Sequence, residues 1–70
     1  MSETTLQLAY QLAQRWLYLN RPDVERLAYE NGDILAKAVL NTHEAALDPT
    51  TVNRRKFVYA VYDYQGKYGT

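Results

Sequence analysis

The chain is short and has no cysteine, and these two properties restrict how it can be stabilised. A core of the size that 70 residues can build typically supplies only about 3–5 kcal/mol of net stability. Natural domains of this length often add disulfides, a metal site or a second chain. Because the chain has no cysteine and one histidine, association with another chain is the route left open. We therefore expect a single helical domain over residues 1–70 that self-associates as a homodimer.

The charge is balanced, with eight acidic and eight basic side chains and a net charge of zero. No overall field therefore attracts the protein to nucleic acid or to an anionic membrane. The basic cluster of Arg54, Arg55 and Lys56 is short. No stretch approaches the run of about 18 apolar residues typical of a membrane-spanning helix, and the N-terminus lacks the positive region of a signal peptide. We expect a cytoplasmic protein without membrane contact.

Residues 4–19 carry the broadest apolar pattern in the chain. Thr4 and Gln7 have the spacing of a capping box, which favours a helix start. On a helical wheel the apolar side chains of this segment fill more than half of the circumference, whereas packing on one neighbour needs a stripe of about 100°. The helix is therefore expected to touch two elements, either both in its own chain or one in another chain. For self-association we single out Leu12, Trp16 and Leu19, with Asn31 and Leu35 from the next segment.

Residues 22–47 predict a second helix, with Pro22 at its first position, where a missing N–H is harmless. The apolar positions keep one helical phase on both sides of Gly32, which favours a continuous helix of about 39 Å. Glycine and asparagine are poor in a helix interior, and Asp33 would cap a new helix well, so a kink or break at 31–33 stays open. A continuous helix would extend past the first one, and its far half would need a partner.

A break at that point would create the pattern of a helix-turn-helix DNA-binding motif within residues 22–43. Leu27, Ala28 and Gly32 have the spacing of that motif. The second helix fits it poorly, because an apolar position of the motif falls on Asn41. A DNA-binding transcriptional regulator is therefore the alternative interpretation. The groups that such a helix would offer to bases or phosphates are few, namely Lys37, Asn41, Thr42 and His43.

Residues 49–65 predict the third helix, although residues 57–64 are rich in the β-branched and aromatic residues typical of strands. Asp48 and Pro49 suit a helix start, and Gly66 suits a helix end. The segment shows no alternation of apolar and polar residues, and no other segment resembles a strand that could pair with it. We expect a helix, with an intermolecular strand at 57–64 as the alternative. The predicted fold is thus an all-α domain of three helices.

Residues suited to catalysis are scarce in this chain. An activated nucleophile needs a suitable side chain beside a base, and the chain has no cysteine and a single serine, Ser2. His43 has no second histidine or cysteine to complete a metal site. The glycines stand alone and form no phosphate-binding loop. We expect no enzymatic activity, no metal and no cofactor.

Tyrosine is frequent, with seven among the 70 residues. On the wheel of the third segment, Tyr59 and Tyr62 leave the apolar face and join Arg55 at the spacing i, i+4 and i+7, which makes an outward ridge. Tyrosine and arginine are enriched at protein interfaces, and the same groups can stack on single-stranded bases; an ordinary solvated surface is the third interpretation. We predict a small non-catalytic module, an accessory regulator or inhibitor that binds another protein. Its predicted contact residues are Arg54, Arg55, Tyr59 and Tyr62.

Overall fold

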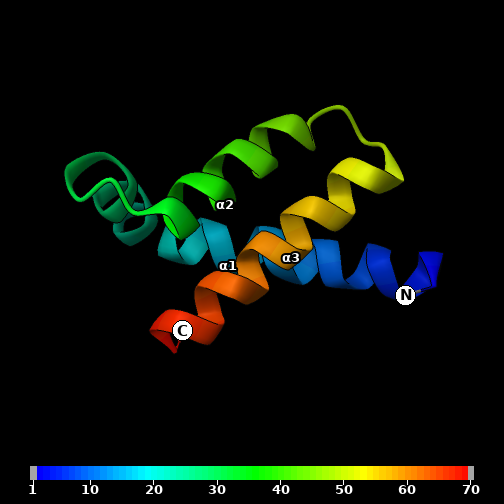
Figure 1. The fold of residues 1–70 in the computed structure, drawn as a ribbon. Helices are drawn as coiled ribbons and strands as arrows, with labels where there is room; N and C mark the ends of the chain where they lie inside the picture. The colour runs from blue at the N-terminus through cyan, green and yellow to red at the C-terminus, as the bar shows by residue number, and fades with distance from the viewer. Residues whose placement is uncertain (1, 70) are drawn as a thin grey trace.

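The computed structural model describes residues 2–69, which form three α-helices and no strand. The helices are α1 (Glu3–Glu30), α2 (Ile34–Ala45) and α3 (Thr51–Tyr68). Each helix packs against both of the others (Figure 1). The prediction of an all-α fold with three helices is confirmed. Residues 57–64 lie within α3, so the strand alternative for this segment is wrong.

The predicted continuous helix over 22–47 is wrong, because α1 ends at Glu30 and α2 begins at Ile34. Gly32 has a φ of +63°, a left-handed conformation that glycine adopts without strain. The Asp33 amide donates back to the Leu27 carbonyl at 3.0 Å, and its carboxylate caps α2 by accepting from the Ala36 amide at 2.9 Å. The local capping chemistry therefore ends one helix and starts the next.

The predicted boundary near Pro22 is also wrong, because α1 continues through this residue. Proline has no N–H to donate to the carbonyl four residues earlier, so it bends a helix where it does not end one. In Figure 1, α1 changes direction between its blue and teal parts. Leu17 and Val24 are both buried, and at 100° per residue they lie only about 20° apart on the helix. The core therefore holds both sides of Pro22 in place.

The third helix is shifted by two or three residues from the predicted range of 49–65. Thr50 caps its start by accepting from the Asn53 amide at 3.1 Å, so Asp48 and Pro49 belong to the preceding connection. Its end lies at Gly69, whose φ is +73° and whose amide donates to the Gln65 carbonyl at 2.7 Å. Gly66, the predicted end, is an internal residue of α3.

The core lies where the three helices meet, and its buried side chains form one cluster. Rings of α1 and α3 meet edge to face, with the centroids of Tyr10 and Phe57 5.7 Å apart. As a whole α1 packs on both α2 and α3, and within the predicted segment 4–19 the rings of Tyr10 and Trp16 contact α3. None of the described helices has the length and apolar character needed to span a membrane. The core consists of Leu6, Ala9, Tyr10, Ala13, Leu17, Val24, Ala28, Ala36, Val39, Ala46, Phe57, Val58, Ala60, Val61 and Tyr64.

Candidate interaction surfaces

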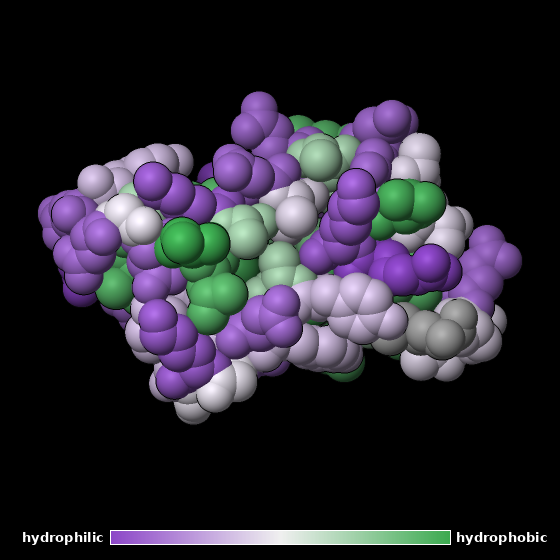
Figure 2. All heavy atoms as spheres, in the orientation of Figure 1, coloured by the Kyte–Doolittle hydropathy of each residue, from purple (hydrophilic) through white to green (hydrophobic). Residues whose placement is uncertain are grey.

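The outer face of α3 carries three of the predicted contact residues. Arg55 is exposed, and Tyr59 and Tyr62 are 46% and 49% exposed. We call these three residues the tyrosine ridge. The buried residues of α3 are Phe57, Val58, Ala60, Val61 and Tyr64, so the core contacts of this helix do not involve the ridge. The front of the molecule over α3 mixes purple and pale side chains, while green ones form small groups over the starts of α2 and α3 (Figure 2).

Arg54, the fourth predicted contact residue, does not join the ridge. Its guanidinium carbon lies 5.2 Å from the centroid of the Tyr10 ring, in a cation–π arrangement with α1. The Arg54 side chain is half-buried, and its Nε is buried without a hydrogen-bond partner. The structure therefore places Arg54 between α3 and α1, where it packs against the fold.

The residues predicted to mediate self-association lie in different environments. Trp16 is half-buried, with its ring centroid 5.1 Å from that of Tyr64, and Leu35 is half-buried against the core. Asn31 is exposed at the C-terminal cap of α1. Leu12 and Leu19 are exposed on α1. Only these two of the five residues are thus placed on an open apolar surface.

Leu8 extends this open surface, although the sequence did not single it out. The exposed fractions of Leu8, Leu12 and Leu19 are 58%, 69% and 65%. At 100° per residue the three side chains fall within about 40° on the helix, on a side that faces away from α2 and α3. Arg15 lies on the same strip and is the only charged residue from Thr4 to Asn20. We call this strip, with its three leucines and one arginine, the leucine face.

A hollow of about 330 Å³ lies between the C-terminal half of α1 and the end of α2. His43 contributes to its wall and is half-buried, with its ring centroid 5.2 Å from that of Phe57. Burial lowers the pKa of His43 below its ordinary value of 6.5, and the positive charge of Arg21 lowers it further. The sequence did not predict this hollow, because residues 22–47 were expected to form one continuous helix, whereas the break after Glu30 brings α2 back beside α1. It is lined by Arg21, Tyr29, Leu40, Asn41, His43, Glu44 and Leu47.

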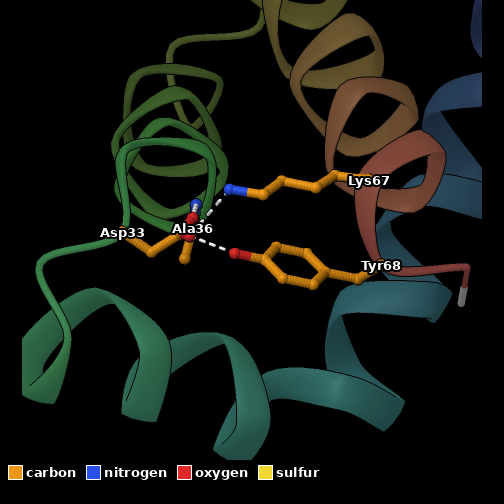
Figure 3. Close-up of polar contacts among 4 residues, drawn as sticks. All are labelled: Asp33, Ala36, Lys67 and Tyr68. Carbon is orange, nitrogen blue, oxygen red and sulfur yellow. Dashed lines mark hydrogen bonds and ion pairs between the residues drawn. The ribbon is translucent and has the colours of Figure 1, made fainter.

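A polar cluster joins the start of α2 to the end of α3 (Figure 3). The Tyr68 hydroxyl donates to Oδ2 of Asp33, and Nζ of Lys67 lies 3.7 Å from the same oxygen. The bond from Tyr68, the capping bond from the Ala36 amide and the charge of Lys67 together hold the pKa of Asp33 below its usual value. The same bond to Asp33 raises the pKa of Tyr68. These contacts tie the start of α2 to the end of α3.

Across residues 2–69, no group of three or more histidine, cysteine or acidic side chains is placed to hold a metal ion. No protein-family model, curated protein or solved structure matches this chain. Evidence for a function therefore comes from the surfaces of the chain itself. Those surfaces are the tyrosine ridge of α3, the leucine face of α1 and the hollow between α1 and α2.

Proposed function

We propose that this protein is a non-catalytic binding module, a small regulator or inhibitor that acts by holding another protein against the outer face of α3. The observation that carries the proposal is the tyrosine ridge, in which Tyr59 and Tyr62 are about half exposed beside an exposed arginine. Tyrosine offers a large rigid surface with a polar end, and arginine can pair with a carboxylate or stack on a ring. The ridge therefore combines apolar area and hydrogen-bonding groups on one side of one helix.

The packing of α3 supports this proposal, because the ridge is separate from the core of its own helix. The buried side of α3 is formed by other residues, among them Phe57 and Val61, which are 0% and 1% exposed. Surface residues outside the core usually change stability by no more than about 0.5 kcal/mol when they are substituted. The ridge residues are thus free to be selected for contact with a partner.

The test is a comparison of captured proteins between two folded variants. In the first, Arg55→Glu, Tyr59→Ala and Tyr62→Ala are combined; in the matched control, Tyr18→Ala removes a tyrosine that is 82% exposed on α1. Both variants should give the helical circular dichroism of the original protein. The proposal expects a partner that the original chain and the control retain and that the triple variant loses. Equal capture by all three proteins, or unfolding of the triple variant, would overturn it.

A DNA-binding regulator is the second candidate, and the break between α1 and α2 favours it. The three residues Asn31, Gly32 and Asp33 connect the two helices, which is the length of the turn in helix-turn-helix motifs. The charges argue against it, since Lys37 is the only lysine or arginine of α2 and Arg54 packs against Tyr10. Duplex DNA binding that weakens steeply as salt is raised would support this candidate, and no binding at low salt would remove it.

A further inference from the structure

The leucine face of α1 is a second unpartnered surface, separate from the tyrosine ridge. Its three leucines are 58–69% exposed, whereas Leu6 and Leu17 of the same helix are 3% and 1% exposed. In Figure 1, α3 crosses in front of the blue half of α1 with α2 beside it. Both neighbours therefore lie on the side of α1 that carries its buried residues. No helix within residues 2–69 covers the leucine face.

The spacing along this face fits one kind of occupant. Leu8, Leu12, Arg15 and Leu19 follow one another at intervals of four, three and four residues, which is the repeat of a coiled-coil seam. At 1.5 Å per residue this seam is about 17 Å long, or roughly three helical turns. It ends before the bend at Pro22. A partner that matches this pattern is another α-helix with apolar residues at the same intervals.

The charge of Arg15 indicates whether that helix could come from a second copy of this chain. The seam holds Arg15, and a guanidinium covered by a partner needs a carboxylate beside it. In an antiparallel pair of copies, Arg15 would face Leu12, and the two Arg15 residues would lie only about 4.5 Å apart along the axis. In a parallel pair the two arginines would face each other directly. The nearest acidic residues of α1, Glu3 and Asp23, are 12 and eight positions away and cannot neutralise either arrangement.

We propose that the leucine face binds an amphipathic helix of a different protein, one that places apolar residues on the three leucines and an aspartate or glutamate opposite Arg15. Thr5 and Gln11 flank the seam, are exposed and uncharged, and form the polar rim of the contact. Arg15 selects the partner and its register, because an apolar or basic residue at the opposing position leaves the guanidinium unpaired. With the tyrosine ridge on α3, the protein has two separate binding surfaces.

Two synthetic helical peptides test this proposal. Both carry leucine at every seam position except one central position, which is glutamate in the first peptide and lysine in the second. By fluorescence anisotropy, the glutamate peptide should bind the original chain about tenfold more tightly than the lysine peptide. Arg15→Glu should reverse this preference, and Leu12→Gln should abolish binding of both peptides. A variant with Tyr59→Ala and Tyr62→Ala should bind like the original chain, because the tyrosine ridge is a different surface.

Three outcomes would overturn the assignment. The first is that neither peptide binds at about 1 mM, the weak end of specific association. The second is that both peptides bind equally well, or that Leu12→Gln leaves their binding unchanged. The third is a stable dimer in sedimentation that Leu12→Gln dissociates, which would assign the face to a second copy. Leu12 is 69% exposed, so Leu12→Gln should keep the helical circular dichroism and the result concerns binding alone.

Discussion

The two exposed faces of this protein differ in chemistry. The tyrosine ridge of α3 is amphipathic and lies close to charged residues such as Lys56 and Asp63. The leucine face of α1 is aliphatic, and its only charge is Arg15. An aliphatic surface with few charges has the composition of an interface core, whereas a mixed surface of tyrosine and arginine can also remain exposed in a free protein. The two faces therefore differ in the kind of surface that would complement them.

The largest effect on the free energy of unfolding should come from substituting a buried leucine of α1, and an exposed leucine of the same helix is its control. Leu17 is 1% exposed and Leu19 is 65% exposed, although they are two positions apart on the same helix. Leu17→Ala should lower the free energy of unfolding by about 2–5 kcal/mol, because it leaves a cavity in a small core. Leu19→Ala should change it by no more than about 0.5 kcal/mol. Urea denaturation measures both, and a large loss for Leu19→Ala would mean that the leucine face is part of the fold.

The sequence predicted the tyrosine ridge better than the leucine face, and the reason is physical. Tyr59 and Tyr62 could be placed outside because the other residues of α3 already made an apolar side. The leucines of α1 all belonged to one wide apolar region, and the sequence alone does not show which part of it the neighbouring helices cover. The core takes Leu6 and Leu17 and leaves Leu12 on the surface. Trp16 and Leu35 were assigned to self-association but lie half-buried against the core.

The helix boundaries were mispredicted because helical phase was treated as evidence of continuity. Ala28 in α1 and Val39 in α2 are both buried, and their phases match across Gly32. Two separate helices that pack on one core each turn their apolar residues inward, so matching phases do not require one helix. The left-handed Gly32 and the capping Asp33 determined the break. At Pro22 the error was the opposite one, since buried residues on both sides hold a bent helix together.

The next effect concerns two glycines, one between the helices and one beside the tyrosine ridge. Gly32 has a φ of +63°, so Gly32→Ala should destabilise the fold by about 1–2 kcal/mol. Gly66 lies within α3, one turn after Tyr62, and a methyl group there would meet no atom within 4 Å. Gly66→Ala should therefore stabilise the protein by up to about 1 kcal/mol. Thermal unfolding of the two variants should shift in opposite directions, and a shift in the same direction would contradict the helix ends described above.

Substitution of Asp33 should have a smaller effect, and it should loosen the end of α3 without loosening the N-terminal part of α1. Asp33 holds the end of α3 through Tyr68 and Lys67, and none of these contacts involves the leucine face. Asp33→Asn keeps an oxygen that can cap α2 but loses the charge that attracts Lys67. Hydrogen exchange should become faster in the last turn of α3, with residues 3–20 of α1 unchanged. Tyr68→Phe is the matched variant, and it should give the same regional pattern.

Lowering the pH should weaken the contact of Asp33 with Tyr68 and Lys67. The pKa of Asp33 is lowered in the fold, so its contribution to stability is complete above its unfolded value of 3.8. That contribution is lost as the pH falls through the lower pKa of the folded state. The original chain should therefore lose stability below about pH 4, and Asp33→Asn should lose less over the same interval. Equal acid sensitivity of the two proteins in urea titrations would show that the carboxylate is not held as described.

The smallest effect on stability should come from protonation of His43, and it should loosen α1 and α3 together. Its pKa is lowered in the fold, so as the pH falls below the unfolded value of about 6.5 the unfolded chain binds a proton first and stability declines. His43 packs on Phe57, and Phe57 in turn contacts Tyr10 of α1. Protonation of His43 therefore acts where the three helices meet, whereas Asp33 acts on the contact between the start of α2 and the end of α3. Between pH 7 and 5, hydrogen exchange should increase to a similar degree in α1 and α3, and His43→Gln should remove this dependence because glutamine does not titrate. If exchange increases only in α3, then His43 is coupled to that helix and not to the shared core, and the leucine face keeps its rigid support at acid pH.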